Sequence, residues 1–293
     1  MQNTKRLITL LIISLGFVIQ FSFASTIKIA VFKDHYSTIY PYTLKNACPS
    51  IDSFQFDDNQ MLAEYIIFCN ALKLAGYQET LELVPYPISI RALQAIQKND
   101  VLASSYGVWH NEIEKFKLQG SPNLLSNNQF SKGLYTTQLL RDKLKGKLFE
   151  PAKYIAVANQ NWQLDWTALS CSGLNLLHVD QYEQMFKILE LGRADFVPLT
   201  FNAEPDMKRT VFGTSLYPIE GIKISFNDAL SFAVNTKTEQ GQLLYKALKQ
   251  GLITLANQGK IEDIYQRLGI TNSTVTDWRK LSCNENYTLM LFS

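Results

Sequence analysis

Few residues in this chain have the types and spacing that chemistry needs. The three histidines, His35, His110 and His178, stand far apart in the sequence. No two of them have a His-x-x-x-His spacing, and none lies at a Cys/His ligand spacing. A lone histidine on a loop is more often a solvated surface residue than a ligand. The histidines therefore predict neither a metal centre nor acid–base catalysis.

Two other patterns carry weak chemical signals. A Ser-x-x-Lys motif at Ser25–Lys28 could activate a serine, but it falls at the expected start of the mature chain, and we interpret it as chance. Asp57 and Asp58 are adjacent carboxylates, which rarely converge on one metal ion. The sequence also has no Gly-x-Ser-x-Gly elbow and no Gly-x-x-x-x-Gly-Lys phosphate loop. We expect no enzyme activity, no metal and no cofactor.

The N-terminal residues predict a secretory signal peptide over residues 1–24. Two basic residues precede the apolar run Leu7–Phe23, and Ser22 and Ala24 are the small residues that a signal peptidase reads. The alternative is a transmembrane anchor, which would need about 20 strongly apolar residues without the polar interruptions seen here. Ser25 rather than cysteine follows the cleavage site, so the exported chain is not expected to be a lipoprotein.

Removal of this signal leaves a charge-balanced chain of 269 residues. The signal holds two of the 28 basic residues and none of the 26 acidic ones, so 26 of each sign remain. Nucleic-acid binding depends on a basic surface, and membrane-surface binding depends on a polybasic patch. Neither is predicted. The length suits two domains, although one large domain is not excluded.

Four cysteines remain after cleavage: Cys48, Cys69, Cys171 and Cys283. An even number in an oxidising compartment suggests two disulfides, with three possible connectivities. We favour Cys48–Cys69, which would tie a polar loop to the following helix and leave Cys171–Cys283. The alternative is that one pair stays as buried thiols.

The first part of the mature chain alternates strands and helices. Apolar periodicity predicts strands at 26–32, 80–84 and 100–106, separated by helices at 61–75 and 88–97. This β-α-β-α-β order implies a parallel sheet covered by helices.

A second unit begins near Leu140. Strands are predicted at 153–158 and 194–200, with a helix at 181–191 that Asp180 and Glu183 would open as a capping box.

Extended segments flank this second unit. They are Gly133–Thr137 before it and Leu230–Asn235 after it. Helices at 240–256 and 260–268 follow, and residues 271–293 form a polar tail.

Several of these segments, in this order, resemble the type 2 periplasmic solute-binding proteins, which include the amino-acid-binding components of ABC importers. Phe232–Asn235 followed by Gly251–Ile261 is similar to the family's returning hinge strand and closing helices. Leu189–Phe196 resembles its helix-Gly-Arg-x-Asp-strand junction, and Arg91–Gln94 resembles a helix start before the third strand. Together the matches span residues 26–270.

The resemblance implies an α/β fold with two lobes, each a mostly parallel sheet flanked by helices, joined by two crossover strands. Residues 25–135 plus 230–270 would form lobe 1, residues 136–229 lobe 2, and residues 271–293 a tail. A solute would bind in the cleft between the lobes and select a closed state by hinge motion.

The sequence departs from the family where amino-acid binders place their charged anchors. The expected arginine after the third strand aligns with Glu114, with Lys115 as the nearest cation. The expected aspartate for the ligand's ammonium aligns with Thr200. An α-amino acid bound in the family's usual way is therefore not expected.

Ten polar or aromatic residues fall on loops that the resemblance directs toward the cleft, where aromatic side chains could stack on a flat ligand. The candidate ligand-binding residues are Tyr42, Ser104, Ser105, Tyr106, Trp109, Trp162, Asp165, Thr200, Asn202 and Glu204. The alternative for each is a role in the core edge or in the contact between lobes.

The leading hypothesis is a monomeric periplasmic protein that captures a small polar or aromatic-containing solute, for uptake or sensing through a membrane permease or sensor. The alternative is a ligand-free interaction module, which fits the missing anchors. A cell-wall-related enzyme is less favoured, because residues 271–293 are too few for a catalytic domain.

Overall fold

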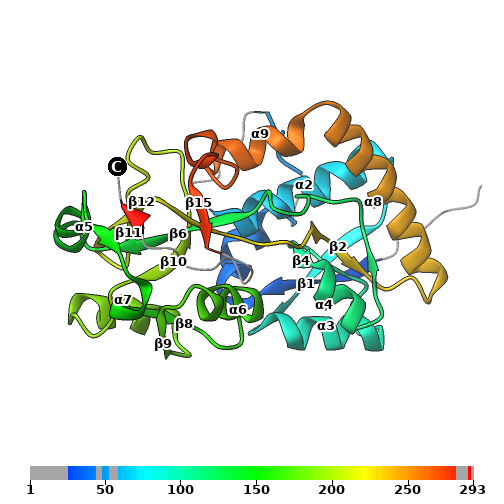
Figure 1. Ribbon diagram of the computed structural model, residues 1–293. Coiled ribbons are helices and arrows are strands. Elements are labelled where there is room, and N and C mark those ends of the chain that lie inside the picture. The colour runs from blue at the N-terminus through cyan, green and yellow to red at the C-terminus, as the bar shows by residue number, and fades with distance from the viewer. Residues whose placement is uncertain (1–25, 44–47, 53–58, 282–289, 292–293) are drawn as a thin grey trace, which may run out of the picture.

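The computed structural model describes residues 26–43, 48–52, 59–281 and 290–291. The predicted signal peptide lies outside these residues, as do Asp57, Asp58 and Cys283. Figure 1 shows two sheets side by side, with the first on the right and the second on the left.

The first sheet has the strand order β2-β1-β3-β14-β5, in which β1, β2 and β3 are parallel and β14 is antiparallel to its neighbours. Its strands are β1 (Thr26–Phe32), β2 (Thr80–Tyr86), β3 (Ala103–Ser104), β5 (Gln119–Gly120) and β14 (Ala233–Val234). Ile27, Ile29 and Val31 of β1 are buried, as its sequence period predicts, and Ala30 on the opposite face is buried as well. The third predicted strand is shorter than expected, because the chain bends on either side of β3.

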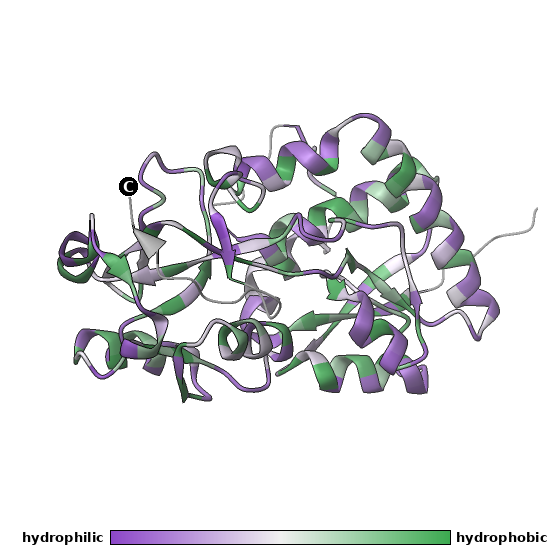
Figure 2. Cartoon of the chain, in the orientation of Figure 1, coloured by the Kyte–Doolittle hydropathy of each residue, from purple (hydrophilic) through white to green (hydrophobic). Residues whose placement is uncertain are grey.

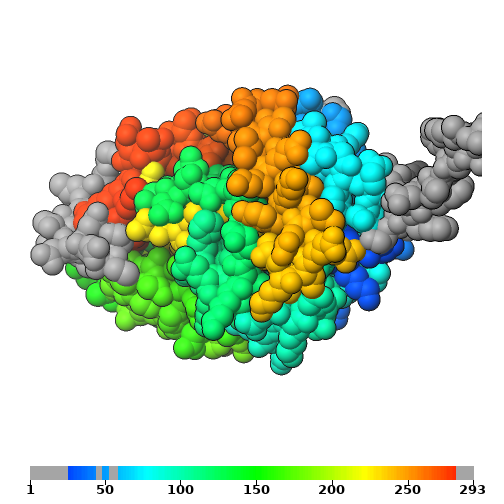
Figure 3. All heavy atoms as spheres, turned by 90° about the vertical axis from the view of Figure 1, so that its right-hand side faces the viewer, coloured from blue at the N-terminus to red at the C-terminus, as the bar shows by residue number. Residues whose placement is uncertain are grey.

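Helices cover this sheet. They are α2 (Gln60–Leu74), α3 (Ser89–Lys98), α4 (His110–Lys115), α8 (Glu239–Asn257) and α9 (Lys260–Arg267), with a short N-terminal run of η1 (Lys33–His35), α1 (Tyr36–Ile39) and η2 (Tyr40–Tyr42). The strands of the first sheet are largely apolar, whereas the outer faces of the helices are polar (Figure 2). Figure 3 shows α8 running along one end of the molecule. The side chain of Asn59 caps α2 by accepting from the backbone N–H of Leu62 at 3.1 Å.

The second sheet has the order β10-β6-β12-β11, with β15 parallel to β12 and the other pairs antiparallel. Its strands are β6 (Ser131–Thr136), β10 (Val197–Thr200), β11 (Arg209–Val211), β12 (Thr214–Ser225) and β15 (Arg279–Leu281). The parallel pair β8 (Ile155–Ala158) and β9 (Asn175–His178) lies beside β10. The shorter elements here are α5 (Gln138–Leu144), η3 (Pro151–Lys153), α6 (Gln163–Cys171), α7 (Tyr182–Glu190) and the pair β7 (Leu148–Phe149) with β16 (Met290–Leu291).

The predicted capping box of α7 does not form. Gln181 is the N-cap and makes no side-chain capping bond. Asp180 instead pairs with His178 Nε2 at 3.1 Å, and Glu183 pairs with Lys187 at 2.7 Å. The helix is formed as predicted, but its apolar face rather than a cap holds it, because Met185, Phe186 and Leu189 are buried.

Two antiparallel segments join the sheets. Residues 121–130 run beside residues 226–232, with backbone bonds from Leu124 N to Leu230 O (2.7 Å) and from Asn128 N to Phe226 O (2.9 Å). The sequence predicts a crossover at Gly133–Thr137, but residues 133–136 pair within the second sheet, so the crossover ends before residue 133. The crossover lies earlier because the register of β6 with β12 begins at Ser131.

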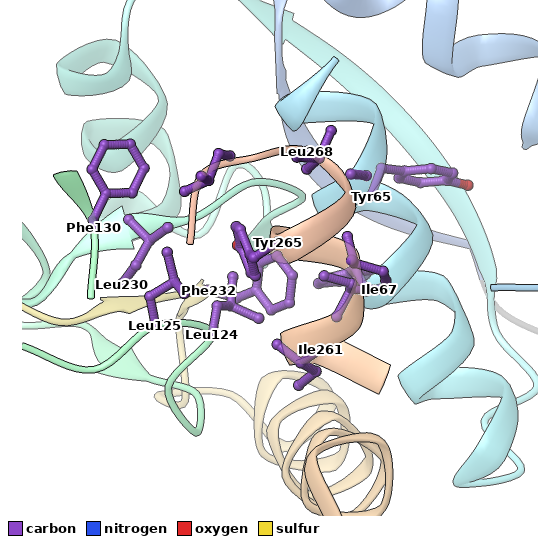
Figure 4. Close-up of a cluster of buried hydrophobic side chains, with 14 of the residues drawn as sticks. Tyr65, Ile67, Leu124, Leu125, Phe130, Leu230, Phe232, Ile261, Tyr265 and Leu268 are labelled. Carbon is purple, nitrogen blue, oxygen red and sulfur yellow. The ribbon is translucent and has the colours of Figure 1, made fainter. Parts of the chain in front are cut away.

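A single apolar core follows these segments from one sheet to the other. On the second crossover, β13 (Leu230–Ser231) pairs with β4 (Val108–Trp109). In Figure 4, Phe130, Leu230 and Phe232 of the crossovers lie in the same cluster as Tyr265 of α9 and Tyr65 of α2. The crossovers are therefore buried for part of their length and are not free linkers.

The segment after α9 packs against the second sheet. The short helix η4 (Ser273–Val275) and β15 follow α9, and the ring of Trp278 lies 5.5 Å from that of Phe201. Lys223 Nζ donates to the carbonyls of Val275 and Thr276 (2.9 Å to the latter), and burial lowers the pKa of Lys223. The first part of the predicted polar tail is thus structured, because it completes an edge of the sheet.

The Cys48–Cys69 disulfide predicted from the sequence is confirmed. It ties the loop before α2 to the middle of that helix, and Asn70 Nδ2 donates to Pro49 O (3.0 Å) beside it. Cys171 at the end of α6 is also disulfide-bonded, and its predicted partner, Cys283, lies outside the described residues.

Across the part of the chain that the structure describes, no helix combines the length and apolar character needed to cross a bilayer.

Gly251 allows α8 to approach α2 closely. A Cβ at this position would lie 1.9 Å from the backbone oxygen of Ala71. Glycine to alanine in a helix normally stabilises by about 1 kcal/mol. We expect Gly251→Ala to lower the free energy of unfolding instead, by about 1–3 kcal/mol, because the helices must separate.

Urea unfolding measures this effect. Gln250→Ala, on the exposed side of the same helix, is the matched control and should change stability little. A stabilised Gly251→Ala protein would show that the two helices are not in backbone contact.

Candidate functional site

Three of the predicted ligand-binding residues serve the interior of the first sheet. Ser104 Oγ donates to Tyr106 O (2.8 Å) and accepts from Ala233 N (2.9 Å), while Ser105 Oγ donates to Ala30 O (2.8 Å). Tyr106 is buried and stacks on Phe32, and burial raises the pKa of its phenol. Each serine hydroxyl therefore already donates its one hydrogen to a backbone carbonyl of the protein.

Four further candidates lie elsewhere. Tyr42 ends η2, half-buried against the core, and Glu204 is exposed on the loop after β10. Asn202 is buried and donates from Nδ2 to Lys208 O at 2.6 Å. Thr200 ends β10, where its backbone oxygen and Oγ1 accept from Arg209 at 2.5 and 3.0 Å. These contacts hold the loop after β10. Of the four residues, only Thr200 lies next to Lys132, which is directly opposite it in the register of β6 and β10.

The remaining three candidates, Trp109, Trp162 and Asp165, come together around a lysine. Lys132 Nζ in β6 donates to Asp165 Oδ1 in α6 at 2.7 Å. The two side chains are only 17% and 10% exposed, so the pair is largely screened from water. No sequence motif marks Lys132, and the one signal for it is a lone lysine in an otherwise buried strand.

Aromatic rings surround this ammonium. Its Nζ lies 5.7 Å from the ring centres of Trp162 and Phe226 and 6.0 Å from that of Phe130, within cation–π range. Trp109 packs edge-on against Phe130 (5.2 Å) and tilted against Phe226 (5.5 Å). We call Lys132, Asp165, Trp109, Phe130, Trp162 and Phe226 the Lys132 cluster.

The Lys132 cluster lies where the sheets meet. Trp109 belongs to β4, which pairs with the second crossover, and Phe130 and Phe226 end the two crossovers. Trp162 and Asp165 begin α6, whose label lies near the middle of Figure 1. One group of side chains thus draws on β4, both crossover segments, β6 of the second sheet and the start of α6.

A buried carboxylate positions the chain leading to Trp109. Glu64 of α2 accepts from Gly107 N (2.7 Å), Tyr265 OH (3.0 Å) and Gln60 Nε2 (2.8 Å). The side chain is fully buried, and desolvation raises the pKa of Glu64 above its usual value despite these bonds. Glu64 therefore ties the turn between β3 and β4 to α2 and α9.

The described residues include no group of three or more histidine, cysteine, aspartate or glutamate side chains that could hold a metal ion. The chemistry that the Lys132 cluster can offer is charge pairing and stacking. Both are binding interactions.

Comparison with known proteins gives the fold. No family model matches the chain, and no curated protein matches its sequence. The ancestral amino acid-binding protein AncCDT-1, described as a precursor of cyclohexadienyl dehydratase, is similar over 83% of this chain and 95% of its own, with a TM-score of 0.51 and 15% identity. The periplasmic VFT2 domain of Bordetella pertussis BvgS is similar over 87% and 93%, with a TM-score of 0.50 and 12% identity.

These neighbours confirm the resemblance inferred from the sequence motifs at the level of the fold. The chain has the α/β, two-lobed fold of the type 2 periplasmic binding proteins. Its sheets are mixed, and the expectation of a mostly parallel sheet does not hold for the second one. In the first sheet β1 pairs in parallel with β2 and β3, whereas among the described strands of the second sheet only β12 and β15 form a parallel pair.

The buried Glu64 predicts a pH-dependent stability. The folded protein holds the Glu64 proton to a higher pH than the unfolded chain does, because its pKa is raised. This contribution is full below the unfolded pKa and is lost as the pH rises through the folded pKa, with a slope of at most about 1.4 kcal/mol per pH unit. Glu64→Gln carries no such proton, so its unfolding free energy should fall less over that range.

Urea unfolding between about pH 4 and pH 8 compares the slopes. Glu220→Gln, at an exposed position of β12, is the control and should keep the slope of the unaltered protein. Equal slopes in all three proteins would contradict the assignment to Glu64.

The Lys132–Asp165 pair predicts a strong energetic coupling. Asp165→Asn leaves a buried ammonium without its carboxylate and should lower the free energy of unfolding by about 3 kcal/mol. The double variant Lys132→Met/Asp165→Asn should lose much less than the two single variants summed, because no buried charge remains.

A double-mutant cycle measured by urea unfolding gives the coupling. The exposed Glu183–Lys187 pair, tested with Glu183→Gln and Lys187→Met, is the control and should show no measurable coupling. A coupling energy between Lys132 and Asp165 as small as that of the control pair would mean that water solvates the Lys132–Asp165 pair.

Proposed function

We propose that this protein binds a small solute between its two lobes, for uptake or sensing, and does not transform it. The Lys132 cluster is the observation that carries this proposal, because a partly screened ion pair among aromatic rings lies where the two sheets meet. Such a site offers orientation by charge and contact area by stacking. The first lobe would hold the first sheet with α8 and α9, and the second lobe would hold the second sheet, including β6 and β15. The lobe boundary that the sequence predicts at 135/136 thus moves back to the crossover segments 121–130 and 226–232, about which the lobes would close.

The proposal extends to the compartment and the partner. The predicted N-terminal signal would export a monomeric chain without a lipid anchor to the periplasm, where a membrane permease or sensor would receive it. The two neighbours that share the fold, an amino acid-binding protein and a periplasmic domain, support a binding role of this general kind. The positive charge of Lys132 argues for a ligand other than an ordinary α-amino acid, because it would repel the ligand's ammonium.

A second candidate function is an interaction module that binds a protein and no solute. Lys132 favours it, because the protein's own ammonium already occupies the space among the rings where a cationic ligand group would bind. An enzyme is the weakest of the three candidates. One neighbour is described as a dehydratase precursor, but the three histidines stay apart from the Lys132 cluster in every described contact.

A thermal-shift screen of the exported chain tests solute binding. Amino acids, peptides, organic acids and sugars are the probes, and at least one class should raise the melting temperature, because a ligand bound only by the folded state stabilises it. Native mass spectrometry of freshly purified protein is the second readout and should show a retained small molecule.

Controls separate the candidates. The solute that shifts the melting temperature should lose its effect on Trp162→Ala protein and keep it on Leu139→Ala protein, which alters an exposed side chain of α5. No shift with any class, together with capture of a protein partner, would favour the interaction module instead.

A further inference from the structure

The hydrogen bonds of Lys132 are incomplete. A lysine ammonium has three N–H donors, and among the described residues only Asp165 Oδ1 accepts from it. Its other neighbours there are the ring faces of Phe130, Trp162 and Phe226. Because the side chain is only 17% exposed, little water reaches the remaining donors. Two of its three donors therefore have no acceptor among the described residues.

A second cation stands at the same end of β10. Lys132 is directly opposite Thr200 in the register of β6 and β10, and Arg209 donates to Thr200 O, Thr200 Oγ1 and Phe201 O. Among the described contacts, Asp165 meets Lys132, and no carboxylate meets Arg209. The local charge is therefore positive, and it lies at the position where a ligand ammonium would need a negative group.

The rings that remain accessible define the other half of the site. Phe130 and Phe226 are buried, whereas Trp109 and Trp162 are half-buried and present part of their indole surface. Trp109 lies in β4, which pairs with β13 of the second crossover, and Trp162 is the N-cap residue of α6. A flat apolar group could contact both indoles while an attached anion meets Lys132.

We infer that the Lys132 cluster binds a small organic carboxylate with a flat, apolar body and no ammonium group. This inference rests on the proposed solute-binding function and names its ligand class. The carboxylate accepts from the free N–H donors of Lys132, and the apolar body lies against Trp109 and Trp162. An ammonium on the ligand would be repelled by Lys132 and Arg209 in a site of low dielectric.

Three probes of similar size and different charge test the inference. They are 3-phenylpropionate (an anion), L-phenylalanine (a zwitterion) and 2-phenylethylamine (a cation). Isothermal titration calorimetry on the whole exported chain should show 3-phenylpropionate binding about tenfold or more tighter than L-phenylalanine, with no binding of the amine. Equal or tighter binding of the zwitterion or the amine would overturn the inference, and so would no binding of any of the three.

Variants assign the effect to Lys132. Lys132→Met should weaken 3-phenylpropionate binding about tenfold or more, whereas Lys143→Met, at an exposed position of α5, should leave it unchanged. If Lys132→Met does not fold, the double variant Lys132→Met/Asp165→Asn removes both charges and should lose the preference for the anion. Retained anion preference in a folded variant without Lys132 would overturn the assignment.

The outcomes also separate this inference from the proposed function. Binding of a sugar, a peptide or an α-amino acid in the broad thermal-shift screen, without binding of 3-phenylpropionate, would refute the carboxylate class and leave solute binding intact. No binding by any class would refute both.

Discussion

The antiparallel contact between residues 121–130 and residues 226–232 is the constraint on which the rest of the molecule depends. The chain leaves the first sheet and returns to it through these two segments, and backbone bonds such as Leu124 N to Leu230 O hold them together. Apolar side chains on both segments extend the core from α2 and α9 toward the second sheet. Any change in how the sheets face each other must therefore bend or shift this pair of segments.

The Lys132 cluster lies at the end of that contact. Phe226 N donates to Phe130 O (3.2 Å), so both residues belong to the contact, and Lys132 follows within β6. Burying an ion pair costs desolvation energy that good geometry and cation–π contact only partly offset. A strand that needed only stability would carry an apolar residue at position 132. The charge at position 132 therefore fits the proposed solute-binding role.

Other features support the same junction from a distance. Glu64 holds the turn before Trp109 to α2 and α9, and the segment after α9 packs against β12 through Lys223 and Trp278. The last of these contacts gives the chain a third passage between the two sheets. Wide separation of the two sheets would therefore be harder than in a protein with two connections between its sheets, because three segments must move together.

The sequence by itself predicted β1, β2, α2 and α3 of the first unit, α7 to α9 and the resemblance to a two-lobed fold, and it favoured the Cys48–Cys69 disulfide, because periodicity, turns and cysteine spacing are local properties. It did not predict α5, α6 or the long strand β12. The sequence also led to Trp109, Trp162 and Asp165. Only the tertiary structure decided that these three meet at Lys132, and that Ser104 and Ser105 serve the interior instead. Contacts between residues 109, 132, 165 and 226 depend on how two sheets and two crossovers pack, and no local pattern encodes that arrangement.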